Sequence, residues 1–126
     1  MLPTKIAVIG QGYVGLPISI AACDAGFLVL GIDTDETKIQ NLTNGKSGIE
    51  DIDDGKLKKF ISAGKYEPSS NYEKISECKI ILICVPTPLS PDLQPNLTAV
   101  ISAVKDISKY FTDDSLIILE STVSPT

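Results

Sequence analysis

Residues 5–15 read Lys-Ile-Ala-Val-Ile-Gly-Gln-Gly-Tyr-Val-Gly, an apolar run that leads directly into a G-x-G-x-x-G motif. An alanine-rich segment follows, and residues 28–33, Leu-Val-Leu-Gly-Ile-Asp, form a second apolar run that ends in an acid. A strand before the glycines, a helix after them and an acid after the next strand are the parts of a dinucleotide-binding βαβ unit. Because all these parts occur together, the segment predicts a dinucleotide site rather than an ordinary glycine-rich turn.

Each glycine of the motif has its own expected task. Gly10 allows the tight turn after the strand, Gly12 lets the backbone approach a pyrophosphate, and Gly15 lets the helix pack closely against the strand. The backbone amides of residues 12–14 are expected at a helix N-terminus, where unpaired donors and the helix dipole favour an anion. Asp33 is expected to accept hydrogen bonds from the two hydroxyls of an adenosine ribose.

The composition is that of one globular domain. Of the 126 residues, 43% are hydrophobic and 21% are charged. The net charge is −5 and all 11 basic residues are lysines, which argues against a nucleic-acid partner. No apolar run approaches the roughly 18 residues of a membrane-spanning helix. Since the first strand begins at Lys5, no signal peptide is expected, and we predict a cytoplasmic protein.

The chain contains three cysteines and no histidine. Cys23, Cys78 and Cys84 lack C-x-x-C spacing, so we expect reduced thiols in the core. The absence of histidine argues against a metal site and removes the commonest general base. The acidic stretch 51–54 is expected to form a solvated loop and a helix cap rather than a metal site.

Predicted strands and helices alternate along the whole chain. Strands are expected at residues 5–9, 28–32, 66–69, 79–85 and 115–119. Helices are expected at residues 13–25, 35–44, 55–63, 72–77 and 97–111. Alternation with short connections predicts an α/β protein of the Rossmann type, in which a doubly wound, mostly parallel sheet has helices on both faces.

The apolar pattern also predicts which side chains are buried. Residues 79–85 and 115–119 are expected to be buried strands. The first helix is expected to bury a stripe made by Val14, Ile18, Ala21, Ala22 and Ala25. The last helix is expected to bury a stripe made by Val100, Ile101, Val104, Ile107 and Ser108. Gly26 is expected to end the first helix and Asn96 to cap the last.

Two polar segments follow apolar strands, Val85-Pro-Thr-Pro88 and Ser121-Thr122. Ligands of doubly wound sheets bind beyond the carboxyl ends of the strands, so both segments would face that crevice. Proline at positions 86 and 88 would hold the Thr87 backbone close to a ligand. The pattern leaves open that the prolines simply end a strand and that Ser121-Thr122 is a polar turn.

Four segments together resemble the UDP-glucose/GDP-mannose dehydrogenase family. They are Gly-Gln-Gly-Tyr-Val-Gly-Leu-Pro at 10–17, Asp-Thr-Asp-Glu-Thr-Lys at 33–38, Val-Pro-Thr-Pro at 85–88 and Glu-Ser-Thr-Val at 120–123. Segments 47–52 and 83–89 further resemble the branch that acts on UDP-N-acetylhexosamines. The chain departs from the family in two places. Residues 124–126 lack a usual glycine, and Asn96 stands where an aspartate is common.

The resemblance implies an NAD-dependent enzyme of polysaccharide or capsule biosynthesis. Such an enzyme oxidises the C6 alcohol of a UDP-sugar, here UDP-N-acetylglucosamine or UDP-N-acetylmannosamine, to a carboxylate in two hydride transfers. The pyrophosphate turn would then consist of Gly10, Gln11, Gly12, Tyr13, Val14 and Gly15. Asp33 and Lys38 would bind the adenosine ribose. The nicotinamide side would be formed by Val85, Pro86, Thr87, Pro88, Ser121, Thr122 and Val123.

The resemblance also implies that most of the catalytic machinery lies outside this chain. Thr122 is expected near the reacting centre in a supporting catalytic role, whereas the family's nucleophilic cysteine lies beyond Thr126. Residues 1–126 are therefore expected to be the NAD-binding domain of a longer, homo-oligomeric protein and to be inactive alone. Two alternatives stay open: the cofactor domain of a β-hydroxyacid or 6-phosphogluconate-type dehydrogenase, and a non-catalytic NAD-sensing module.

Overall fold

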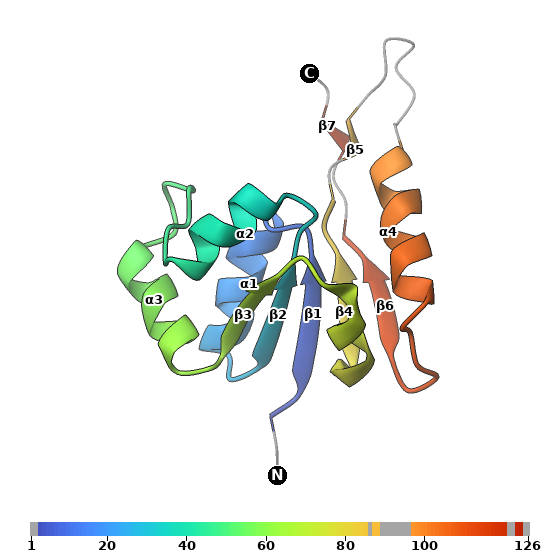
Figure 1. Ribbon diagram of the computed structural model, residues 1–126, viewed down its shortest axis with the longest axis horizontal. Helices are drawn as coiled ribbons and strands as arrows, with labels where there is room; N and C mark the ends of the chain where they lie inside the picture. The colour runs from blue at the N-terminus through green and yellow to red at the C-terminus, as the bar shows by residue number, and fades with distance from the viewer. Residues whose placement is uncertain (1–2, 86, 89–96, 121–122, 125–126) are drawn as a thin grey trace.

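The computed structural model describes residues 3–85, 87–88, 97–120 and 123–124. Within them, a five-stranded parallel sheet has the order β3-β2-β1-β4-β6 (Figure 1). Its strands are β1 (Lys5–Ile9), β2 (Leu28–Ile32), β3 (Tyr66–Ser69), β4 (Ile80–Ile83) and β6 (Leu116–Leu119). The strand order runs outward from β1 in both directions, so the predicted doubly wound α/β fold is confirmed.

Helices cover both faces of the sheet. One face carries α1 (Gly15–Asp24), α2 (Glu36–Thr43) and α3 (Asp54–Ser62), and the other carries α4 (Thr98–Ser108) and the 3-10 helix η1 (Tyr72–Glu77). Successive residues of β1 alternate between the two cores: Ile6 and Val8 face the first, Ala7 and Ile9 the second. Burial on both faces explains why the strand sequences are continuously apolar.

Local capping signals set most helix ends. Gly26 follows α1 with a φ of 97°. The Phe27 N–H donates to the Ala22 carbonyl at 3.0 Å, which closes the helix in a Schellman motif. Asp53 caps α3 by accepting from the Lys56 N–H, and Asn71 caps η1 by accepting from the Glu73 N–H. The predictions that Gly26 ends the first helix and that the acidic stretch caps a helix are confirmed.

The predicted buried stripe of α1 is only partly right: Ile18 and Ala22 are partly buried and pack against the core. The residues that the helix buries are Gly15, Leu16, Ser19, Ile20 and Cys23, whereas Val14, Ala21 and Ala25 are exposed. The reason is the close approach of the helix to β1: a Cβ at Gly15 would overlap the carbonyl oxygen of Gly10. The helix can pack at this distance only with Gly15 facing inward. Apolar residues occur all around this helix, so periodicity could not determine its rotation.

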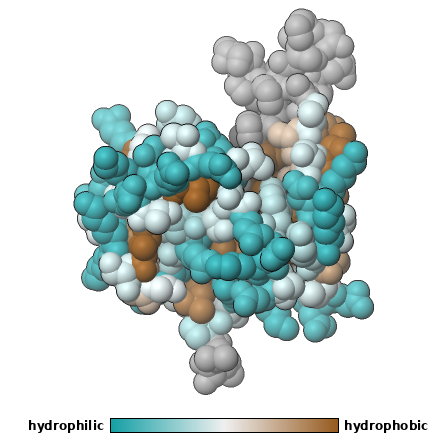
Figure 2. Space-filling view, viewed as in Figure 1, coloured by the Kyte–Doolittle hydropathy of each residue, from teal (hydrophilic) through white to brown (hydrophobic). Residues whose placement is uncertain are grey.

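The predicted burial of the last strand is also wrong. Residues 116–119 of β6 are between 38% and 57% exposed. Among the described residues, β6 pairs only with β4, so it is an edge strand. The α4 stripe is only partly as predicted, because Ile107 is buried while Ile101, Val104 and Ser108 are exposed. Figure 2 shows hydrophobic surface beside α4. The N-cap residue of α4 is Leu97; Asn96 lies outside the described residues.

Cys23, Cys78 and Cys84 are free and buried, as predicted. Burial raises the pKa of each thiol to about 11. Protonated thiols of this kind pack as small apolar side chains. In the part of the chain that the structure describes, no helix is long and apolar enough to cross a bilayer.

Candidate dinucleotide site

The turn between β1 and α1 lies at the carboxyl edge of the sheet, between the ends of β2 and β4. The Gly10 N–H donates to the Ile32 carbonyl at 2.6 Å, and Gly10 has a φ of 97°. A Cβ at Gly10 would lie 2.7 Å from the Cys84 carbonyl oxygen. Both the backbone conformation and the neighbouring strand end therefore require glycine at this position.

Gly12 has a different environment from Gly10 and Gly15. Among the described residues, the only atom within 4 Å of a Cβ placed there would be Lys38 Nζ, at 3.9 Å. Within the described residues, the amides of Gly12, Tyr13 and Val14 donate to no acceptor. Tyr13 is 84% exposed. The turn thus presents unpaired donors to open space at the start of α1, an arrangement that suits an anion.

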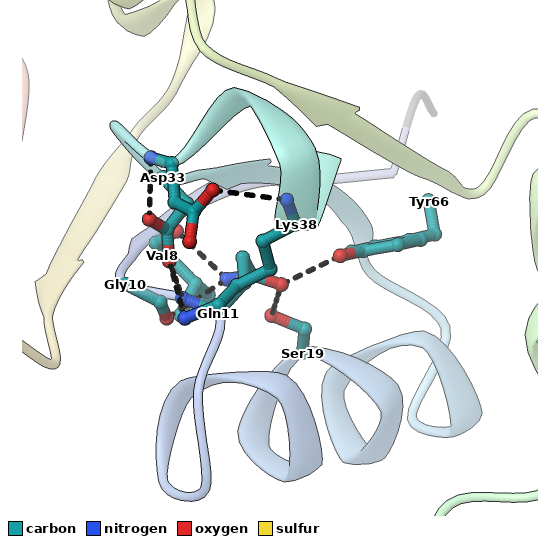
Figure 3. Close-up of polar contacts among 8 residues, drawn as sticks. Val8, Gly10, Gln11, Ser19, Asp33, Lys38 and Tyr66 are labelled. Atoms are coloured by element: carbon teal, nitrogen blue, oxygen red, sulfur yellow. Dashed lines mark hydrogen bonds and ion pairs between the residues drawn. The ribbon is translucent and has the colours of Figure 1, made fainter. Parts of the chain in front are cut away.

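Asp33 follows β2 and lies over the glycine turn (Figure 3). Its Oδ2 accepts from the Gln11 N–H at 2.9 Å and lies 3.4 Å from Lys38 Nζ. Its Oδ1 accepts from the Asp35 N–H at 2.9 Å. The Asp33 side chain is 13% exposed, and these three contacts hold its carboxylate at the edge of the sheet.

The cap of α2 explains how Lys38 reaches this site. Asp35 is the N-cap residue, and its Oδ1 accepts from the Lys38 N–H at 3.1 Å. Lys38 therefore lies in the first turn of α2, where its side chain points back to Asp33 (Figure 3). The two residues predicted to bind the ribose are thus neighbours in space.

Two hollows adjoin the turn, and Lys38 lines both. The first, of about 300 Å³, is lined by Gly10, Asp33, Lys38 and Val85 of the predicted set, together with Ile9, Thr34, Tyr72, Ala99, Ser102 and Ala103. The second, of about 500 Å³, is lined by Gln11, Gly12, Tyr13 and Lys38 of the predicted set, together with Asp35, Thr37, Asn41, Lys46, Ser47, Gly48 and Ile49. Val14 and Gly15 line neither hollow: Val14 is the exposed N-cap residue of α1, and Gly15 is buried beneath the turn.

Sequence reasoning missed two parts of the first hollow. The first part is a stripe of small residues on α4, made by Ala99, Ser102 and Ala103. Their helical spacing is visible in the sequence and could have predicted a shared face. Tyr72 gave no such signal, because its position depends on the path of η1 beneath the sheet edge. Burial, with the nearby carboxylates of Asp106 and Asp33, raises the pKa of Tyr72 to about 12. Its hydroxyl is therefore protonated at neutral pH.

Two short strands, β5 and β7, lie beside each other beyond the main sheet (Figure 1). β5 (Thr87–Pro88) pairs in parallel with β7 (Val123–Ser124), with Thr87 opposite Val123. Pro86, Ser121 and Thr122 were also predicted to contribute to the site and lie outside the described residues. The pairing brings together segments that are more than thirty residues apart in the chain, at the edge where ligands of this fold bind.

These features define the class of the protein. A doubly wound parallel sheet, a glycine turn at the point where strand order reverses, and an acid at the end of the next strand are the marks of dinucleotide-binding α/β domains.

Comparison with known proteins identifies the family. Residues 4–126 match the NAD binding domain of the UDP-glucose/GDP-mannose dehydrogenase family, so the chain belongs to this family as its NAD-binding domain. The chain is 34% identical over 122 residues to the UDP-N-acetyl-D-mannosamine dehydrogenase of Pyrococcus horikoshii, covering 96% of this chain and 29% of that protein.

Two further proteins similar to the chain are also nucleotide-sugar dehydrogenases. The UDP-N-acetyl-D-glucosamine 6-dehydrogenase of Pseudomonas aeruginosa is 32% identical over 125 residues, covering 99% of this chain and 29% of the relative. The structure of the UDP-N-acetyl-mannosamine dehydrogenase Cap5O from Staphylococcus aureus superposes with a TM-score of 0.87 at 33% identity, covering 97% of this chain and 30% of that one. The chain therefore spans less than a third of the length of these relatives.

Proposed function

We propose that NAD binds across the carboxyl edge of the sheet. The pyrophosphate lies against the amides of residues 12–14, and the adenosine ribose lies against Asp33 and Lys38. The adenine end occupies the hollow beside Tyr72. The nicotinamide end extends toward the segments 85–88 and 121–123.

The observation that carries this proposal is the contrast among the three glycines of the turn. The chain's own backbone requires Gly10 and Gly15, because a Cβ at either position would collide with a carbonyl group. Nothing in the described chain requires Gly12, where a Cβ meets only open space and a distant lysine. A ligand that approaches the backbone closely explains the glycine at position 12, because a Cβ there would occupy the ligand's space.

Each predicted residue then has a stated role. Asp33, which accepts from the main-chain N–H of Gln11, accepts hydrogen bonds from the ribose hydroxyls. Lys38 lies close enough to contact the ribose or a phosphate oxygen. Bound NAD supplies the hydride acceptor. One side of the nicotinamide site is formed by Val85, Pro86, Thr87 and Pro88. Ser121, Thr122 and Val123 form the other, with Thr122 in a supporting role near the reacting centre.

We further propose the reaction of the whole enzyme. Two relatives bear the names UDP-N-acetyl-D-mannosamine dehydrogenase and UDP-N-acetyl-D-glucosamine 6-dehydrogenase. Their names support oxidation of the C6 alcohol of a UDP-N-acetylhexosamine to a carboxylate, in two hydride transfers to NAD. Membership of this family favours that reaction over that of a β-hydroxyacid dehydrogenase.

In this proposal residues 1–126 are the NAD-binding domain of a longer, homo-oligomeric protein. The exposed apolar side chains of β6 support it, because a further segment of chain packed there would remove them from water. The three buried, unpaired thiols support a reducing, cytoplasmic location.

Calorimetric titration of the chain with NAD tests the site. Gly12→Val places a branched side chain where the pyrophosphate is proposed to lie. Losing about two charge-assisted amide contacts should cost roughly 3–6 kcal/mol, at least a hundredfold in affinity. Circular dichroism of the variant should match the parent, because the added side chain has open space. A folded Gly12→Val chain that binds NAD as the parent does would refute the proposed site.

An activity assay tests the domain assignment. We expect the longer enzyme to form NADH from NAD and UDP-N-acetylhexosamines and the 126-residue chain alone to form none, because the family resemblance implies a nucleophilic cysteine outside residues 1–126. NADH formation by the purified 126-residue chain would contradict this assignment.

A further inference from the structure

A buried polar cluster lies behind the glycine turn, on the side away from the proposed cofactor. Its centre is the Gln11 side chain, whose Oε1 accepts from the Tyr66 hydroxyl at 2.6 Å and from the Ser19 hydroxyl at 3.2 Å (Figure 3). The Gln11 Nε2 donates to the carbonyls of Val8 at 3.0 Å and Gly10 at 3.1 Å. Both Nε2 protons of Gln11 are thus donated and its Oε1 accepts from Tyr66, while the single Ser19 proton is shared with the Gly15 carbonyl at 2.9 Å.

The cluster fits into the core because one strand residue, Gly31, has no side chain. Gly31 lies inside β2, one residue before its end, where glycine weakens a strand. A Cβ at Gly31 would lie 2.6 Å from Gln11 Oε1 and 2.7 Å from the Tyr66 ring. Because Gly31 has no side chain, there is space for both Gln11 and Tyr66, which form the shortest hydrogen bond in the cluster.

The cluster is built from distant parts of the chain and shielded from water. Gln11 and Tyr66 are each 1% exposed, and 55 residues separate them. Burial raises the pKa of the Tyr66 hydroxyl well above its ordinary value, so the hydroxyl remains a donor across the physiological range. In a dry environment a satisfied polar network holds its members in one geometry, because losing a partner leaves a buried polar group unpaired.

Gln11 connects this cluster to the proposed cofactor contacts. Its side chain is held by Tyr66 and Ser19, while its main-chain N–H donates to Asp33 Oδ2 at 2.9 Å. The next peptide begins the run of unpaired amides at residues 12–14. Gln11 is therefore one of the three contacts of the Asp33 carboxylate and is also part of the glycine turn.

We propose that Tyr66 is a positioning residue for the dinucleotide. Through Gln11 it fixes the glycine turn and Asp33 in the binding arrangement before the cofactor arrives. The inference rests on the proposed NAD site and adds to it a residue on β3 that contacts no part of the cofactor. A pre-organised site binds more tightly because less freedom is lost on binding.

Tyr66→Phe in the 126-residue chain tests this role, since it removes one hydroxyl and keeps the ring. We expect the NAD dissociation constant from calorimetry to rise about three- to tenfold, the range that loss of one buried hydrogen bond produces. The matched control is Ile81→Val on β4, which removes one buried carbon from the opposite core and lowers the unfolding midpoint to a similar degree. Its NAD affinity should equal that of the parent.

The same substitution in a Gln11→Met variant distinguishes a positioning role of Tyr66 from a general effect on stability. Gln11→Met keeps the volume of the side chain but cannot accept from the Tyr66 hydroxyl. If Tyr66 acts through Gln11, Tyr66→Phe should cause no further loss of NAD affinity in this background. An equal loss in both backgrounds would overturn the inference.

The parent chain separates failure of this inference from failure of the proposed function. A parent that binds no NAD refutes the proposed site, and the inference with it. A parent that binds NAD no more tightly than Tyr66→Phe refutes the inference alone. Weakening of NAD binding by Ile81→Val to the same degree as by Tyr66→Phe also refutes the inference alone.

Discussion

The first βαβ unit and the β6 edge have equally apolar strand sequences, but they have opposite environments in the folded chain. Residues 6–9 of β1 are at most 5% exposed, whereas every residue of β6 is at least 38% exposed. β1 pairs with β2 and β4 and is covered on both faces, while β6 pairs with β4 alone among the described strands. An apolar run thus indicates a strand, but its position in the sheet decides how much of the strand is buried.

The two regions should therefore differ in their tolerance of change. In the first unit, backbone atoms of β1, β4 and α1 approach so closely that two glycines have no room for a Cβ. At the β6 edge, side chains contact water and have space to vary. The contrast should show most strongly at Gly15 and least at Ile117 of β6.

Gly15→Ala should have the largest effect, because the added Cβ overlaps the Gly10 carbonyl oxygen. We expect it to lower the free energy of unfolding by more than about 4 kcal/mol or to prevent folding, since α1 must move away from β1. Gly12→Ala is the matched control, with the same chemical change in open space, and should alter stability by less than about 1 kcal/mol. Urea unfolding measures both, and equal stability of the two variants would contradict the packing argument.

Alkaline pH should destabilise the two buried cores on either side of β1. The folded chain holds its buried thiols at pKa values of about 11. An unfolded thiol loses its proton near pH 8.5, so the unfolded chain binds fewer protons between about pH 9 and 11 and stability falls in that window. We expect a loss of about 1–2 kcal/mol for each thiol, and full stability below pH 8.5.

Urea unfolding at pH 8 and at pH 10.5 measures this loss. Cys78→Ala should reduce the pH dependence because it removes one of the three thiols. A polar variant of β6 should keep the parent's pH dependence, because the edge carries no thiol. Equal stability of the parent chain at the two pH values would contradict the burial of the thiols.

NAD should bind more tightly than NADP to the first unit. A 2′-phosphate would meet the Asp33 carboxylate, and the chain contains no arginine to receive it. We expect a difference of at least about 1–2 kcal/mol. Asp33→Ala should reduce this preference and weaken NAD binding less than Gly12→Val does, because water can replace the carboxylate at the ribose. Competition calorimetry measures both, and equal or tighter binding of NADP by the parent would refute the role of Asp33.

Ile117→Thr on β6 should have the smallest effect on the isolated chain. The side chain is 39% exposed, so we expect the free energy of unfolding to change by less than about 1 kcal/mol. The same substitution at Ile9, which is 1% exposed, should cost about 2–3 kcal/mol, because it removes a buried carbon and buries a hydroxyl. Thermal unfolding of the two variants measures the contrast, and an equal loss at both sites would mean that β6 is as buried as β1.

The sequence by itself determined the features whose signals are local. Apolar runs, glycines and caps predicted the strands, most helix ends and the parallel doubly wound sheet, because these depend on residues within one or two turns of each other. The same local signals identified the glycine turn and the acid that follows the second strand. The spacing of four motifs also indicated the family, which the match over residues 4–126 confirms.

Only the tertiary structure decided the features that depend on distant partners. The rotation of α1 follows from the contact between Gly15 and Gly10, which periodicity in a nearly all-apolar helix does not reveal. The exposure of β6 follows from its place at the edge of the sheet. The hydrogen bond between Tyr66 and Gln11 joins residues 55 positions apart, and no local pattern of the chain encodes it. Such contacts exist only once the strands are paired, because pairing sets the distance and direction of each side chain relative to partners elsewhere in the chain.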